Sequence, residues 1–283
     1  MPTDDATEFG GADAELSSRR RRGASGARLR KSAGRAIRGI VGDRLLLRVA
    51  RLAASSAGLE FKPLMHVPAS YGETARTIEA RHASQTVEAV VALRRKYAAP
   101  VIGRVPVWSL IEKLAQCIDP SDEKLYGASQ QLHVLQILDG MERDGVATRE
   151  LTLAALLHDL GKILLLTGEA PENVVCFNEP IGRYPRGVGL DNCILQWNHD
   201  EFAYSRLREF LPDGIAWLIR YHSIVRSSCE SYMDARDREY ADRYLTVFAR
   251  YDHGTKSPYS LPRKRIDDYR DVIESALPRE IVF

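Results

Sequence analysis

Four histidines and two aspartates stand at positions where they could bind metal ions. Each histidine has large apolar neighbours, in the segments QLHVL, LLHDL, QWNHDEF and IRYHSI. The neutral imidazole of histidine is the commonest metal ligand in proteins, and burying titratable groups without partners is costly. The six residues are His133, His158, Asp159, His199, His222 and Asp252. A lone histidine of this kind more often hydrogen-bonds a backbone carbonyl, but together the six predict a buried metal centre.

The adjacent pair His158-Asp159 indicates a centre with two metal ions. A histidine ring nitrogen binds one ion, whereas the two oxygens of a carboxylate can each bind one. Asp159 could therefore bridge two ions. A second pair, His199-Asp200, makes the ligand set ambiguous. Adjacent helical residues rarely both reach one metal, so we expect Asp200 to orient His199 or its neighbours from outside the ligand set.

Apolar residues at a period near 3.6 predict the helices that must position these side chains. Thr148 and Asp191 are expected N-caps, and Pro212 stands at a first helical position. Residues 168–190 are rich in Gly and Pro and predict a loop. No alternating strand pattern is present, so the fold class is all-α. Helices are expected at residues 74–98, 105–118, 128–145, 148–166, 191–211, 212–225 and 237–253.

Charge is distributed unevenly along the 283 residues. Residues 1–18 contain five acids and no base, and residues 19–42 contain nine Lys or Arg and no acid. The totals are 40 basic and 38 acidic residues, so 31 bases and 33 acids remain in residues 43–283. A tail so poor in large apolar residues is expected to be disordered. We expect a disordered basic tail over 1–42, an amphipathic helical linker over 43–60 and one helical domain over 61–283.

Composition also limits the compartment and the partners. No apolar run approaches the ~18 residues of a membrane-spanning helix, and the acids that open the chain argue against a transit peptide. The four cysteines form no CxxC pair, which favours reduced thiols in a cytoplasmic protein. We expect a monomer whose tail binds neither nucleic acid nor membrane, although contact with either anionic partner is the alternative for so many arginines.

The order H…HD…D resembles the HD-domain superfamily, which consists mostly of metal-dependent phosphohydrolases on a helical bundle. The fuller pattern, with His199 and His222 included, resembles the HD-type mixed-valent di-iron oxygenases, and among them the myo-inositol oxygenase family. Further motifs carry this resemblance across roughly residues 75–275. They are SQTVEAVVALRRKY, ALLHDLGKIL, LQWNHDEFAY, IRYHS and DHGTK.

The resemblance implies an HD-domain-like bundle over 61–283 that holds two iron ions, cycling through Fe(II)/Fe(III), with O2 as co-substrate. It implies ring-opening cleavage of a carbon–carbon bond in a small cyclic polyol, myo-inositol giving glucuronate. His133, His158 and Asp252 would hold the first iron. His199 and His222 would hold the second, and Asp159 would bridge both.

The same resemblance implies the substrate contacts Lys162, Asp119, Lys256 and Ser223. Lys162 lies one helical turn beyond His158, so both side chains share a face of the expected helix. Two departures from the family bear on the substrate. The 40 residues from Asp159 to His199 are fewer than in the animal members, and the N-terminal lid motif is not recognisable.

Three alternatives stay open at this point. The same di-iron chemistry could act on a different cyclitol or on a phosphonate, although a phosphonate would require several cations and only Lys162 and Lys256 are evident. An HD-type phosphohydrolase would use a metal-bridging water as its nucleophile. A degenerate HD fold that binds a partner through the basic tail is disfavoured because all six ligand positions are filled.

Overall fold

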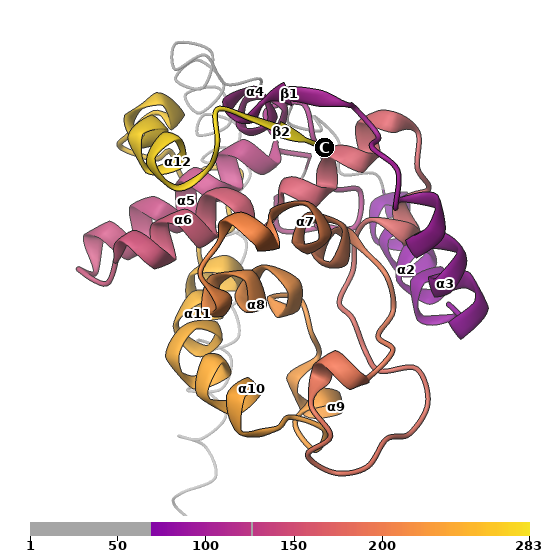
Figure 1. The fold of residues 1–283 in the computed structure, drawn as a ribbon. Helices are drawn as coiled ribbons and strands as arrows, with labels where there is room; N and C mark the ends of the chain where they lie inside the picture. Colours follow the sequence, from indigo (N-terminus) through magenta and orange to yellow (C-terminus); the bar gives the residue numbers. More distant parts are fainter. Residues whose placement is uncertain (1–68, 126) are drawn as a thin grey trace, which may run out of the picture. The chain divides into compact units, whose positions relative to one another are not determined.

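The computed structural model describes residues 69–125 and 127–283. The expected tail over 1–42 and the linker over 43–60 lie outside these residues, so both stay predictions. Helices make up most of the described chain, as the apolar period predicts, and the fold is all-α in class (Figure 1). None of the described helices combines the length and the apolar character that crossing a membrane requires.

Five helices surround the site. α5 (Gln130–Arg143) is buried along most of its length and contacts α6 (Arg149–Leu157) and α11 (Thr246–Gly254). α7 (His199–Leu207) and α8 (Asp213–Tyr221) lie side by side (Figure 1), and α8 also packs against α6. Their facing surfaces bury leucine, isoleucine and aromatic side chains such as Leu156, Phe202 and Leu218. Each of these helices brings at least one titratable residue to a shared centre.

The helix expected over 148–166 is interrupted at the HD pair. Thr148 caps α6 as predicted, accepting a hydrogen bond from the Leu151 amide at 3.1 Å. α6 ends at Leu157, and a 3₁₀ helix, η1 (Leu160–Thr167), follows Asp159. Gly161 in η1 lies against the backbone of α7, so closely that a Cβ there would lie 2.1 Å from the His199 carbonyl oxygen. The interruption therefore lets η1 approach the helix that carries His199.

Two other expected helices are divided or shortened where a side chain caps a helix. Residues 74–98 form α2 (Ala69–Ala83) and α3 (Val87–Lys96), because the Thr86 hydroxyl accepts a hydrogen bond from the Ala89 amide and begins a new helix. The helix expected over 191–211 begins only at His199. Its N-cap is Asn198, whose side chain accepts from the Asp200 amide at 2.9 Å, so the Asp191 cap was wrong. In both places a capping side chain overrides a continuous apolar period.

A small antiparallel sheet was not expected, and the helix expected over 105–118 was wrong at both ends: Val105 and Pro106 lie in a strand, and the helix covers only Val107–Lys113. β1 (Arg104–Pro106) pairs with β2 (Glu280–Val282), with Val105 opposite Ile281. Three-residue strands are too short to show an alternating pattern in sequence. The remaining elements are α4 (Val107–Lys113), η2 (Pro171–Asn173), η3 (Leu190–Asn192), η4 (Arg208–Phe210), α9 (Arg226–Cys229), α10 (Ala235–Tyr240), the π-helical turn η5 (Ala241–Leu245), η6 (Ile266–Tyr269) and α12 (Arg270–Ala276).

Candidate metal centre

The six expected ligands come together from five helices. Most of them lie at helix ends: His158 and His222 are the C-caps of α6 and α8, and His199 is the first residue of α7. His133 lies within α5, and Asp252 lies in the last turns of α11. All six side chains are buried, with at most 5% of any residue exposed. At a helix end the backbone can come close to the centre, because no further turns of the helix stand in the way.

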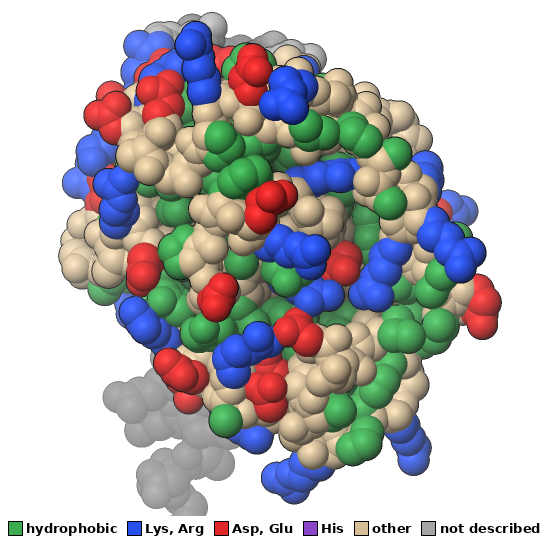
Figure 2. Space-filling model, in the orientation of Figure 1, with side chains coloured by type: hydrophobic (Ala, Val, Ile, Leu, Met, Phe, Trp, Pro, Cys, Tyr) green, Lys and Arg blue, Asp and Glu red, His purple; other side chains and the backbone are tan. Residues whose placement is uncertain are grey.

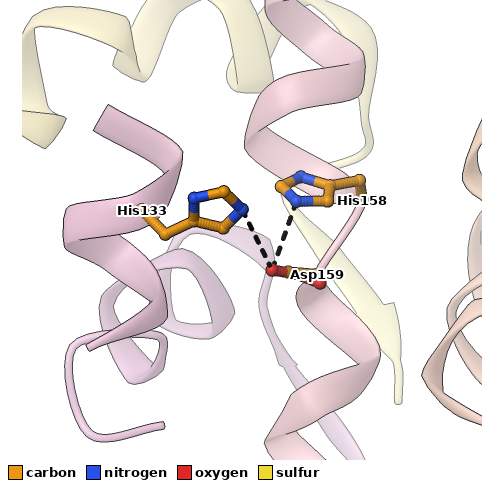
Figure 3. A group of neighbouring side chains, drawn as sticks. All are labelled: His133, His158 and Asp159. Carbon is orange, nitrogen blue, oxygen red and sulfur yellow. Dashed lines mark ion pairs between the residues drawn. The ribbon is translucent and has the colours of Figure 1, made fainter. Parts of the chain in front are cut away.

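One oxygen of Asp159 faces the first group of ligands. Its Oδ2 atom lies 3.2 Å from Nε2 of His158 and 3.9 Å from Nε2 of His133, and both rings point toward it (Figure 3). The Asp252 carboxylate completes this side, with Oδ1 2.9 Å from Nε2 of His133 and 4.0 Å from Nε2 of His158. His133, His158 and Asp159 are close enough to share one metal ion.

The other oxygen of Asp159 faces the second group. Its Oδ1 atom lies 3.1 Å from Nε2 of His199 and 3.8 Å from Nε2 of His222. These two ring nitrogens are 3.3 Å apart. Asp159, His199 and His222 form a second set that could hold an ion. Asp159 thus belongs to both three-residue sets, and one of its carboxylate oxygens faces each set.

Backbone carbonyls fix the orientation of three of the imidazole rings. Nδ1 of His158 lies 2.9 Å from the Ala155 carbonyl, and Nδ1 of His222 lies 3.0 Å from the Ile219 carbonyl. Nδ1 of His199 lies 2.6 Å from the Val174 carbonyl. A carbonyl can only accept, so each Nδ1 donates a proton away from the centre and each Nε2 faces the centre, where it can offer its lone pair to a metal ion. This arrangement is typical of metal-binding histidines.

The charges at the centre also suit a cation. Nε2 of His158 is buried and, with the ring proton on Nδ1, faces carboxylate oxygens that have no proton to donate to it. Burial alone would lower the pKa of His222, but the carboxylates of Asp200, Asp159 and Asp252 raise it to about 9. The buried carboxylates are stabilised when positive charge lies among them, and a metal ion can supply that charge in place of a proton on His222. The donor set therefore fits a metal cofactor.

Asp200 lies beside the second group and is held by neighbouring residues. Its Oδ2 atom accepts hydrogen bonds from the Ser223 hydroxyl at 2.6 Å and the Asn178 side chain at 3.5 Å. Its Oδ1 atom lies 3.0 Å from Nε2 of His199 and 3.5 Å from Nδ1 of His222. The Ser223 hydroxyl, expected to meet substrate, donates to Asp200 and accepts from Asn198.

Lys162 lies between two carboxylates and is almost fully buried. Its ammonium is 3.0 Å from Asp119 Oδ2, 3.1 Å from Asp159 Oδ1 and 3.1 Å from the Gln130 amide oxygen. Burial alone would lower the pKa of Lys162, but Asp159 and Asp119 raise it above its ordinary value. Burial would raise the pKa of Asp119, and the Lys162 charge lowers it. Both groups are therefore ionised at neutral pH.

Lys256 has a partner that the sequence did not suggest. Its ammonium lies 2.8 Å from Asp122 Oδ2 and 3.9 Å from Asp252 Oδ1. Burial would lower the pKa of Lys256, but these two carboxylates raise it. Lys256 is therefore linked to the first ligand group through Asp252.

A cavity of about 770 Å3 opens onto these residues. Its wall brings together most of the expected site, while His133 and His158 lie deeper. The site residues on its wall are Asp119, Asp159, Lys162, His199, His222, Ser223, Asp252 and Lys256. On the face of the molecule drawn in Figure 2, basic and acidic side chains are interspersed.

Comparisons with known proteins agree on one family. The family model described as Myo-inositol oxygenase matches residues 73–179 and 167–283. Inositol oxygenase 1 of Arabidopsis thaliana is 30% identical over 227 residues, which cover 66% of this chain and 72% of that protein. Inositol oxygenase 2 of the same plant is 28% identical over 67% of this chain and 71% of its own. The inositol oxygenase of Rattus norvegicus is 26% identical over 52% of this chain and 63% of its own.

Proposed function

The chain belongs to the myo-inositol oxygenase family, and on that premise we propose that it cleaves a ring carbon–carbon bond of a cyclic polyol with O2, converting myo-inositol to glucuronate. One oxygen atom of O2 enters the new carboxylate and the other leaves as water. The polyol supplies all four electrons, so no external reductant is consumed.

Two iron ions, one ferrous and one ferric, are the cofactor in this proposal. His133, His158 and Asp252 would hold one ion, His199 and His222 would hold the other, and Asp159 would contribute one carboxylate oxygen to each. When bound, the pair supplies Lewis acidity toward substrate hydroxyls and exchanges electrons with O2. Asp200 stays outside the ligand set and, with Ser223 donating to it, steadies His199 and His222.

The observation that carries this proposal is the division of the Asp159 carboxylate between two ligand groups. Oδ2 faces His158 and Oδ1 faces His199, at 3.2 and 3.1 Å from their Nε2 atoms. A site for one ion would need only one of these sets.

Lys162 and Asp119 orient the substrate. A polyol hydroxyl both donates and accepts hydrogen bonds, and these two groups offer a donor and an acceptor 3.0 Å apart on the cavity wall. Lys256 and Ser223 extend the polar wall on other sides. Holding the ring in one orientation decides which C–H bond meets the oxidant.

The charge arrangement favours a neutral polyol over an anionic substrate. Lys162 is paired with Asp119 and Asp159, and Lys256 with Asp122 and Asp252. A phosphonate or a phosphate ester would bring its negative charge close to these carboxylates. This pairing disfavours both the phosphonate and the phosphohydrolase alternatives.

The test is O2 uptake by protein reconstituted with Fe(II) and supplied with myo-inositol. We expect glucuronate and consumed O2 in equal amounts, with no phosphate released from phosphate monoesters. An Asp159→Asn variant should lose this activity, and the matched surface variant Asp267→Asn should keep it, since Asp267 is on η6, outside the cavity wall. Phosphate release without O2 uptake would establish the phosphohydrolase instead.

We also propose that the protein is a monomer and that it is cytoplasmic. All four cysteines, Cys117, Cys176, Cys193 and Cys229, are free thiols, which suits a reducing compartment. Light scattering coupled to gel filtration tests the oligomeric state, and a mass near 31.7 kDa is expected.

A further inference from the structure

The cavity above the candidate metal centre is larger than one cyclitol ring requires. Its volume of about 770 Å3 corresponds to about 25 water molecules at roughly 30 Å3 each. Myo-inositol has twelve non-hydrogen atoms, fewer than half the number of those waters, and bonded atoms pack more closely than waters, so a single ring fills less than half of this space. A ring held at Lys162 and Asp119 therefore leaves an outer chamber toward solvent.

The inner and outer parts of the cavity wall differ in character. The inner wall consists of buried charged groups such as Asp159, Lys162 and His199. The outer wall carries exposed side chains from separate segments: α2, the turn before α5 and the loop after η2. These are Glu79, Glu123, Lys124, Phe177 and Glu179.

Phe177 presents an apolar ring at this mouth. It is 51% exposed, more than the other exposed large apolar residues of the described chain. Its ring contacts the His253 ring edge to face, with centroids 5.4 Å apart. His253 is itself fixed, because its carbonyl accepts a hydrogen bond from Lys124 at 3.2 Å and its Nε2 lies 3.4 Å from Asp252. Phe177 is thus an aromatic surface on the wall of this cavity, held in place by its contact with His253.

The charges beside Phe177 indicate which kind of group, attached to the inositol ring, the outer chamber can accept. Glu79, Glu123 and Glu179 bring three carboxylates to the mouth, against one ammonium from Lys124. Carboxylates accept hydrogen bonds from hydroxyls and repel phosphate. An aromatic face packs well against the C–H face of a sugar ring. The combination suits a neutral, hydroxylated ring.

We propose that the outer chamber is a subsite for a neutral sugar ring, so that the enzyme also oxidises an inositol that carries a glycosyl substituent. This inference rests on the proposed function. The inner ring reacts as free myo-inositol does: one carbon–carbon bond breaks, one atom of O2 enters the new carboxylate and the other leaves as water. The glycosidic bond is kept, and the four electrons again come from the inositol ring.

The experiment compares three compounds with the iron-loaded full chain: myo-inositol, galactosyl-myo-inositol and the inositol phosphate substituted at the same ring position. O2 uptake and product mass are measured for each, and binding is measured without O2 by titration calorimetry. We expect turnover of the galactoside to a product that retains galactose, and at least roughly tenfold weaker binding of the phosphate. Equal binding of phosphate and galactoside, or oxidation of myo-inositol with no galactoside turnover, would overturn the subsite.

Variants of Phe177 separate a role in this subsite from a structural role. In Phe177→Ala, the ratio of kcat/KM for galactoside to that for myo-inositol should fall about threefold to tenfold, and Phe177→Trp should restore it. Leu166→Ala is the matched control, since Leu166 is also exposed but lies outside the cavity wall. Equal losses on both substrates in Phe177→Ala contradict the subsite. If myo-inositol itself is not oxidised, the proposed function fails. The subsite is then decided by binding alone: galactoside should bind more weakly to Phe177→Ala than to the wild-type protein, and equal binding contradicts the subsite.

Discussion

Lys162 brings a positive charge into the buried wall of the cavity, between Asp119 and Asp159. A protonated lysine has no lone pair to offer a metal, so its part in the site is to donate hydrogen bonds. Lys162→Met should keep both irons and impair catalysis. A hydrogen bond to a charged group is worth about 1.5–3 kcal/mol, so kcat/KM for myo-inositol should fall roughly tenfold to a hundredfold.

Steady-state kinetics and iron analysis on the same preparation check this expectation. Lys264→Met is a suitable control because Lys264 pairs with Glu142 at the surface. Loss of iron from Lys162→Met would mean that the lysine acts through Asp159 and the structure of the site. Unchanged kcat/KM would place the substrate elsewhere.

The residue types predicted which side chains come together at the centre, but not all of the residues that hydrogen-bond or form ion pairs with the site. His133, His158, His199 and His222 stand out because histidines in apolar surroundings are few in this chain. Gln130, which accepts from Lys162, and Asp122, which pairs with Lys256, gave no such signal. Asp122 and Lys256 are far apart in the chain, and only the fold brings them together.

At the scale of elements, the contact between η1 and the start of α7 positions His199. A Cβ on Gly161 would lie 2.1 Å from the His199 carbonyl oxygen, so Gly161→Ala must push the two segments apart. Overpacking of this kind typically costs about 1–3 kcal/mol. We expect a lower Tm and an iron content that falls from two per chain toward one, measured by metal analysis. Gly254→Ala should change neither, because nothing lies within 4 Å of a Cβ there. Two bound irons in Gly161→Ala would show that this contact does not set the position of His199.

Glu169, in the turn after η1, forms hydrogen bonds with the end of α3, and its contribution to the stability of the fold should depend on pH. Burial alone would raise the pKa of Glu169, but hydrogen bonds from Asn173, Lys96 and Tyr97 lower it to about 2, from an ordinary value of 4.5. The carboxylate therefore stabilises the fold above about pH 4.5, and this stability is lost as pH falls toward 2. Glu169→Gln should lower Tm at pH 7, and its difference from wild type should shrink below pH 4.5 in thermal melts. A Tm difference that is constant over this range would contradict the lowered pKa.

Helix identity was predictable at this scale, whereas helix ends were less so. The apolar period located α5, α6, α8 and α11, which contain or are capped by four of the six candidate ligands. The apolar period continued through the breaks before α3 and after α6. A period shows which face of a helix is buried, and it does not show where a cap or a close backbone contact ends the helix. Asn198, with Asp200 and Glu201 in the turn after it, has the residue types of a helix start, but it lies inside a continuous apolar pattern.

For the whole molecule, the composition of the first 42 residues predicts a tail that takes no part in the chemistry. The candidate site is drawn from residues 119–256 of the domain. Deleting residues 1–42 should therefore leave iron content and kcat/KM within about twofold of the full chain, and hydrogen exchange should show little amide protection over residues 10–35. A large loss of kcat/KM on deletion, or strong protection in that range, would assign the tail a structural role.

The central claim is a mixed-valent di-iron centre bridged by Asp159, and EPR spectroscopy with iron analysis tests it most directly. Protein loaded with Fe(II) and then partly oxidised should contain two irons per chain and give the signal of a coupled Fe(II)/Fe(III) pair. Adding myo-inositol should change that signal, since the substrate binds at the same centre. Asp159→Asn should lose the coupling, while Asp267→Asn should keep it. One iron per chain, or only the signal of isolated ferric ions in the wild-type protein, would contradict the account.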